Sequence, residues 1–170
     1  MSAAPDDFGW PVLARLLRGA PGAVLATHAN LGELTAIVEP SRLLEAMRFL
    51  RDDPVTAFDM LMDLTGVDYL GYPDRSGPRF EVAYHLYSLE RNQRLRVRVG
   101  VPAEPCEVDS VVSLWPSANW MEREAWDLYG IRFRGHPDLR RLLLYEEFEG
   151  HPLRKDYPVK KRQPLIGPIN

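Results

Sequence analysis

Residues 79–101, RFEVAYHLYSLERNQRLRVRVGV, contain the two clearest strands of the sequence and decide its fold class. Residues 79–88 form the first strand, residues 95–101 form the second, and residues 90–93 make the turn. Apolar residues alternate with arginines along the second strand: Leu95, Val97, Val99 and Val101 against Arg94, Arg96 and Arg98. One face therefore joins the core, and the other carries guanidinium groups that are either solvated or bind a partner.

The segments before this strand pair alternate between helical and strand patterns. Residues 10–18 have apolar side chains at helical spacing. Residues 23–27 and 34–38 are β-type runs, and residues 28–32 between them are typical of a hairpin loop. A helix is predicted after Pro40 by an apolar face at helical spacing: Leu43, Leu44, Met47 and Leu50.

A variant capping box predicts a further helix in the middle of the chain. Thr56 is followed by Asp59 three positions later, and the pattern runs through about Leu64 to Gly66. With the strands above, the prediction is an α+β protein. We expect a two-layer domain, a mostly antiparallel sheet with helices packed on it, and an extended C-terminal arm.

Residues 119–130 carry a dense group of charges on one predicted helix. Asn119 and Glu122 form another variant capping box, and Gly130 suits the left-handed position after the last turn. Arg123 and Asp127 are four apart and are expected to pair. Glu124 and Asp127 repel each other unless cations meet them, and arginines that follow can supply these: Arg132, Arg134, Arg140 and Arg141. Carboxylates on one short helix without a histidine at i+3 or i+4 favour an ion-pair network over a catalytic or metal site.

Residues 132–170 differ in kind from residues 1–131, and we expect a core domain followed by an extended arm that binds a partner. The arm is rich in proline and mostly aperiodic, and residues 132–162 hold nine basic and five acidic side chains. It has apolar anchors, which favour contact with another protein over disorder: Leu139, Leu142, Tyr145, Phe148 and Tyr157. Its two Gly-His-Pro corners contain His136 and His151, which lack further metal ligands.

The composition excludes several classes of protein. A net charge of −3 over 170 residues gives no general reason for binding nucleic acid or an anionic membrane. A single cysteine, Cys106, excludes an internal disulfide framework and a four-thiolate iron–sulfur cluster, and its acidic neighbours are expected to raise its pKa. No segment is long and apolar enough to span a bilayer, the first residues do not read as a secretory signal, and we expect a cytosolic protein.

Several motifs together resemble a known family. These are EREAWDLYG at residues 122–130, HPDLR at 136–140 and EGHPLRKDYP at 149–158, and residues 63–69 and 114–120 resemble the family as well. They are similar to the signature of the C subunit, or 30-kDa subunit, of NADH:quinone oxidoreductase, respiratory complex I. The resemblance runs from about residue 40 to 158.

The resemblance implies a redox-inert structural subunit of the peripheral arm of that complex, which transfers electrons from NADH to quinone. No catalytic, cofactor-binding or metal-binding residue is expected in this chain; FMN and iron–sulfur clusters belong to other subunits. The implied partners are the large quinone-site subunit (D, or 49-kDa type) and neighbouring iron–sulfur subunits. The implied location is the cytoplasmic side of the bacterial inner membrane, reached only through other subunits. Nine residues carry over as structural or interface residues: Glu122, Arg123, Glu124, Asp127, His136, Arg140, His151, Arg154 and Asp156.

Three other functions remain open at this point. An equivalent subunit of a membrane-bound hydrogenase or formate hydrogenlyase would carry similar motifs. A nucleic-acid-binding protein could use the basic arm, and a small hydrolase could use the carboxylates of residues 122–127, although no nucleotide-binding or nucleophile motif supports either one.

Overall fold

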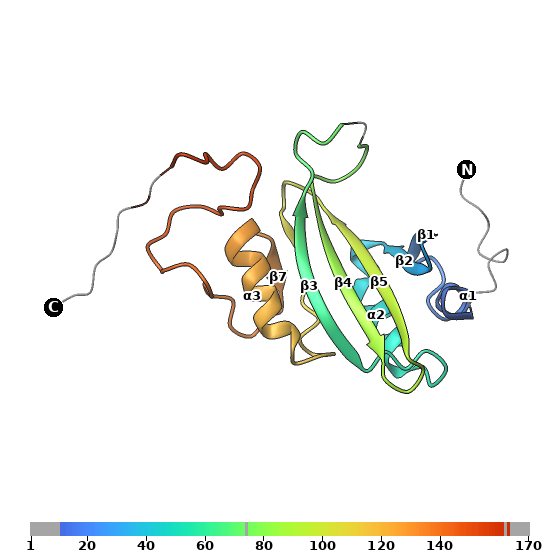
Figure 1. The fold of residues 1–170 in the computed structure, drawn as a ribbon. Helices are drawn as coiled ribbons and strands as arrows, with labels where there is room; N and C mark the ends of the chain where they lie inside the picture. Colours follow the sequence, from blue (N-terminus) through green and yellow to red (C-terminus); the bar gives the residue numbers. More distant parts are fainter. Residues whose placement is uncertain (1–10, 74, 162, 164–170) are drawn as a thin grey trace.

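The fold is built on one five-stranded sheet with the strand order β1-β2-β5-β4-β3 (Figure 1). The computed structural model describes residues 11–73, 75–161 and 163. Trp10, the predicted start of the first helix, and residues 162 and 164–170 of the arm lie outside the described part. The strands are β1 (Val24–Asn30), β2 (Glu33–Val38), β3 (Met60–Asp68), β4 (Phe80–Ser88) and β5 (Gln93–Val101).

The pairing in this sheet is antiparallel except between β2 and β5, which run parallel. A second, small sheet pairs β6 (Glu107–Asp109) with β7 (Arg132–Arg134). The helices are α1 (Pro11–Gly19), the short 3-10 helix η2 (Pro40–Arg42), α2 (Leu43–Asp52) and α3 (Ala118–Tyr129). The predicted α+β class with a mostly antiparallel sheet is confirmed. None of the helices in the described residues is long and apolar enough to cross a membrane.

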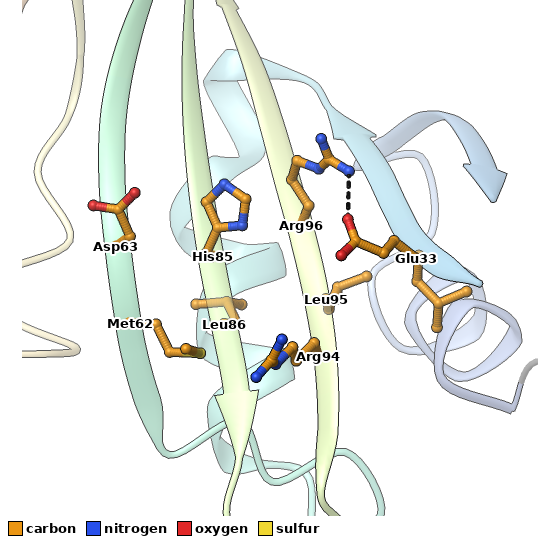
Figure 2. A pocket seen from close by; sticks show the side chains of 9 residues that line it. Glu33, Met62, Asp63, His85, Leu86, Arg94, Leu95 and Arg96 are labelled. Atoms are coloured by element: carbon orange, nitrogen blue, oxygen red, sulfur yellow. Dashed lines mark hydrogen bonds and ion pairs between the residues drawn. The ribbon is translucent and has the colours of Figure 1, made fainter. Parts of the chain in front are cut away.

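The alternation along β5 places the core on one side of the sheet. Leu95, Val97, Val99 and Val101 are at most 1% exposed and pack with buried residues of α1, α2 and α3 in one cluster. In Figure 1, α2 lies behind the sheet and α3 lies beside β3. Arg94 and Arg96 of β5 lie on the opposite, outer face (Figure 2), and the labelled helices of Figure 1 lie behind or beside β3, β4 and β5 rather than over this face.

The helix predicted over residues 56–64 is wrong, because residues 60–68 form β3, an edge strand paired with β4. A β-bulge between Leu61 and Asp63 shifts the register, so the buried side chains Leu61 and Leu64 are three residues apart. The misreading came from the Thr56–Asp59 spacing and from Gly66, which imitate the two ends of a helix, whereas Gly66 lies inside β3. The Thr56 hydroxyl caps no helix there and donates to the carbonyl of Leu50 at 2.9 Å.

The arm runs back over the core domain of its own chain. Beyond β7, its described residues have no helix or strand, and they curve around α3 (Figure 1). The predicted boundary at residue 131 falls inside the core, since Phe133 of β7 is 2% exposed and pairs with Val108 of β6. For the arm as a whole the sequence analysis offered disorder or contact with another protein. It anticipated contact within the chain only through the arginines named as cations for residues 122–127. Partner binding by the arm stays a prediction.

Candidate functional site: the junction of α3 and the arm

Helix α3 buries charged side chains against the arm. The helix begins after Ser117, whose side chain makes no capping bond, so the predicted Asn119–Glu122 capping box is not formed. At its other end Gly130 adopts φ 72°, and its N–H donates to the carbonyl of Trp126, as predicted. The buried residues of α3 include three that are ionisable: Glu122, Arg123 and Asp127. We call the contacts between α3 and residues 136–156 the arm junction.

Asp127 is the centre of the arm junction. Its side chain is completely buried, and its Oδ2 accepts the N–H groups of Leu142, Leu143 and Leu144 at 3.0, 2.8 and 2.9 Å. Its Oδ1 accepts Nη1 of Arg141 at 2.7 Å. Burial raises the pKa of Asp127, but these four donors together outweigh it, and the net pKa is lowered. A carboxylate held in this way fixes the course of the arm.

Arg123 holds the arm from the same helix but does not pair with Asp127. Its Nε and Nη2 donate to the carbonyls of Arg140 and Arg141 at 3.1 and 2.9 Å. Its guanidinium lies 5.2 Å from the centre of the exposed Trp120 ring. The expected Arg123–Asp127 pair is therefore wrong, and the cation that meets Asp127 is Arg141.

The later part of the arm closes the C-terminal end of α3. Arg154 Nε donates to the carbonyl of Tyr129 at 2.5 Å, and Nη2 donates to the carbonyl of Gly130 at 3.4 Å. These carbonyls have no partner inside the helix, and a cation is favoured at a helix C-terminus. His151 Nδ1 lies 2.9 Å from the carbonyl of Asp127, and burial lowers the pKa of this histidine.

A second buried carboxylate, Asp68 of β3, ties the far end of the arm to the sheet. Its Oδ2 accepts the N–H of Lys155 at 2.9 Å and pairs with Nη2 of Arg79 at 2.9 Å. Arg79 also pairs with Asp156 of the arm at 2.8 Å. Burial raises the pKa of Asp68, but bonds from Arg79, Lys155 and Leu70 prevail and lower it to about 2. Sequence reasoning placed Asp68 in a family motif but gave it no role, because its partner Lys155 is 87 residues away.

The remaining predicted residues lie at the margins of the arm junction. His136 Nε2 lies 3.1 Å from the carbonyl of Asn119, while its Nδ1 accepts the N–H of Asp138, which assigns the proton to Nε2. Arg140 is exposed and pairs with Asp138 at 2.9 Å. Glu124 is exposed on α3. Of the nine predicted residues, the structure thus gathers five whose side chains take part in the junction: Arg123, Asp127, His136, His151 and Arg154.

Glu122 lies on the side of α3 that faces the sheet, away from the arm. It is 0% exposed, and its Oε1 accepts the N–H of Val111 at 2.7 Å. Burial raises the pKa of Glu122 to about 7, although the Ser110 hydroxyl and the Val111 N–H both act in the opposite direction. In the described residues, no group of three or more His, Cys, Asp or Glu side chains is arranged to hold a metal ion.

Cys106 borders the junction. It is half-buried, with its Sγ 3.9 Å from Nη2 of Arg154. Burial raises the pKa of its thiol; Arg154 and Arg79 act against this, and Glu104 adds to it. The sequence predicted a raised pKa for Cys106, and this is confirmed, although burial contributes more to the rise than the acidic neighbour Glu104 does. A thiol with a raised pKa is a poor nucleophile at neutral pH.

The outer face of the sheet carries a shallow depression of about 300 Å³ between β2, β3, β4 and β5 (Figure 2). Arg96 pairs there with Glu33 at 3.1 Å. Two residues further along β5, Arg98 pairs with the buried Glu81. The guanidinium of Arg94 lies 5.9 Å from the centre of the Tyr87 ring. The arginine face is thus largely neutralised by the chain's own acids, and both roles considered for it stay open.

Comparison with known proteins defines the class to which this fold and junction belong. A family model described as "Respiratory-chain NADH dehydrogenase, 30 Kd subunit" matches residues 36–163. The chain belongs to this family. The match includes α3, both carboxylates that hold the arm, and the arm to its last described residue.

Individual relatives agree with the family. The C subunit of NADH-quinone oxidoreductase from Thiobacillus denitrificans is 52% identical over 151 residues, which are 86% of this chain and 76% of that protein. The same subunit from a Roseiflexus species is 48% identical over 148 residues, 87% of this chain and 83% of that protein. A solved structure titled "Nqo5 of the trypsin-resistant fragment (1-134) in P63 form" matches at 40% identity with a TM-score of 0.67, covering 75% of this chain and 99% of the fragment.

A more distant match shares the fold alone. It comes from the "membrane-bound sulfane sulfur reductase (MBS), an archaeal respiratory membrane complex", with a TM-score of 0.71 and 20% identity over 88% of this chain and 85% of that one. The fold therefore occurs in at least two respiratory membrane complexes.

Proposed function

We propose that this chain is a redox-inert structural subunit of the peripheral arm of NADH:quinone oxidoreductase, on the cytoplasmic side of the bacterial inner membrane. The observation that carries the proposal is that the family match spans residues 36–163, which include the whole arm junction. In this role the chain binds no FMN or cluster itself. It supports electron transfer to quinone by holding neighbouring subunits in place, and the other subunits attach it to the membrane.

The arm junction gives this role a physical basis. An arm without helix or strand keeps one course only if something fixes its backbone, and here Asp127, Arg123 and Asp68 bind backbone groups of the arm directly. The surface that results is preformed, so a partner does not have to order it on binding. We assign the nine predicted residues structural and interface roles, with the large quinone-site subunit and the adjacent iron–sulfur subunits as partners.

The test is purification of the assembled complex through a tag on this chain in its own host. The large quinone-site subunit and iron–sulfur subunits are expected to co-purify, and the Asp127→Asn variant is expected to lower their yield without changing turnover per assembled complex. Recovery of the tagged wild-type chain as a lone folded monomer would contradict the proposal. The control is Glu90→Gln, at an exposed acid outside the nine residues. Unchanged activity of Glu124→Gln would count against a hydrolase.

The second candidate is the equivalent subunit of a membrane-bound hydrogenase or formate hydrogenlyase; the sulfane sulfur reductase is an example of the same fold in another respiratory complex. The neighbouring genes separate the two. An NADH-binding flavoprotein gene supports the first, whereas nickel-ligating cysteine motifs in the large-subunit gene support the second. Identity of about 50% to C subunits of NADH-quinone oxidoreductases favours the first.

A further inference from the structure

Two completely buried polar side chains, one on α3 and one on β4, lack a full set of hydrogen bonds. Glu122 Oε1 accepts one backbone N–H, but Glu122 Oε2 has no hydrogen-bond partner within the described residues. The hydroxyl of Tyr84 is likewise without a partner there, and Tyr84 is 0% exposed. The two groups influence each other, since burial and then the charges of Glu122 and Asp109 raise the pKa of Tyr84.

The charges around Glu122 do not stabilise an ionised carboxylate. From β6, Asp109 is itself acidic and is bound to Arg134 of β7 at 2.8 Å. On α3, Arg123 and Asp127 are directed to the arm. From β4, the buried Tyr84 is near enough for the charge of Glu122 to raise its pKa, and its hydroxyl is neutral below that pKa. No basic side chain of the described residues therefore acts on Glu122, and the effects of the nearby Ser110 hydroxyl and the Val111 N–H, which lower its pKa, do not outweigh its burial.

Burial of an ionised carboxylate without a cation costs free energy, and such a group usually binds a proton and becomes neutral. A protonated carboxyl still accepts the N–H of Val111 through one oxygen. Its other oxygen gains an O–H donor, which a tyrosine hydroxyl can accept. A proton on Glu122 thus gives its unpartnered oxygen a hydrogen to donate, and the Tyr84 hydroxyl is a buried group that still lacks a hydrogen bond.

We propose that Glu122 is a buried proton-binding site: the folded chain holds a proton on this carboxyl, facing the hydroxyl of Tyr84, and releases it to solvent when α3 leaves the sheet. The inference goes beyond the proposed function and does not depend on it. Because α3 also holds the arm, its docking on β3 and β4 becomes coupled to proton uptake near neutral pH.

The sign of the effect follows from the two states. Burial raises the pKa of Glu122 to about 7 in the folded chain, whereas its ordinary value, which applies to the unfolded chain, is 4.5. Stability linked to the proton is fully present below pH 4.5 and is lost as pH rises to about 7. The difference between these two pKa values corresponds to about a 300-fold change in the unfolding equilibrium constant.

The experiment compares urea unfolding of the full-length wild-type chain, Glu122→Gln and the control Glu124→Gln from about pH 4 to about pH 8. Glutamine imitates the protonated carboxyl. Glu122→Gln is expected to gain stability over wild type as pH rises through this range, reaching about 300-fold, and the exposed Glu124→Gln is expected to show no such trend. A pH-independent difference for Glu122→Gln would overturn the proposal.

A second measurement does not require the variant to fold. Infrared difference spectra of the wild-type chain below and above about pH 7 report the C=O stretch of a protonated carboxyl directly. A band that disappears as the pH rises through this value, with no matching change when ordinary exposed carboxyls titrate near pH 4, is expected. A spectrum showing only titration near pH 4 would overturn the proposal.

Discussion

The sheet and the arm junction are held together by different forces. The sheet buries a continuous apolar face, in which side chains such as Val97 and Val99 are fully covered by the helices. The arm has little apolar burial and is fixed by hydrogen bonds from its backbone to Asp127, Arg123 and Asp68. Apolar packing tolerates small rearrangements, whereas a buried charge with several donors accepts one geometry. We therefore expect that the arm can detach from α3 while the sheet stays folded.

The strongest test of this comparison is Asp127→Asn. Removing the charge leaves Arg141 without its carboxylate and weakens the acceptor of three N–H groups, a loss of about 3 to 5 kcal/mol in local stability. Hydrogen exchange of the amides of Leu142, Leu143 and Leu144 is expected to accelerate while that of β5 is unchanged. The control is Asp138→Asn, an exposed acid paired with Arg140 in the same arm. Equal acceleration in β5 and the arm would show that the two regions open together.

An acid titration tests the second attachment. The lowered pKa of Asp68 contributes stability that is present above pH 3.8 and is lost as pH falls towards about 2. Asp68→Asn is expected to remove this part of the acid dependence, measured as the free energy of urea unfolding against pH. The matched variant is Asp156→Asn, whose half-exposed side chain shares Arg79 and is expected to have a smaller effect. If the two variants have the same acid profile, burial of Asp68 does not set its role.

The smallest effect is expected on the outer face of the sheet. Arg94→Ala is expected to change the free energy of unfolding by less than about 0.5 kcal/mol, because no ion pair of Arg94 is seen in the described residues. Arg98→Ala should cost more, since it removes one of the two cations of the buried Glu81. Comparable costs would contradict this ranking. A drop in complex yield for Arg94→Ala with unchanged stability would assign the arginine face to a partner.

The sequence predicts the regular parts of the fold because their periodicity is local. Strands β4 and β5 and helix α2 alternate or repeat cleanly, and Gly130 marks the end of α3 by its left-handed backbone. Strand β3 was missed because the Thr56–Asp59 spacing and Gly66 imitate the two ends of a helix, and because the β-bulge interrupts the alternation that marks a strand. The start of α3 was predicted wrongly because Glu122 was taken as the second residue of a capping box with Asn119, whereas its side chain is buried in the interior.

The site could be predicted in its composition but not in its pairing. The group of charges on residues 122–127 and the arginines that follow are visible in the sequence, and Arg141 was among the cations named for Asp127. Asp127 also binds three backbone N–H groups, and no side-chain pattern announces these. Asp68 and Lys155 are 87 residues apart, so only the folded chain brings them together.

The end of α3 shows what the late position of the arm means for a growing chain. A Cβ at Gly130 would lie 2.5 Å from Arg154 and 2.6 Å from His151, so the returning segment fits directly against the bare glycine. A polypeptide that stops before residue 154 still contains every strand of the sheet, but it leaves the carbonyls of Tyr129 and Gly130 without their guanidinium. Such a shortened chain also lacks Lys155 and Asp156, so it loses the cap on α3 and the attachment of the arm to β3 together.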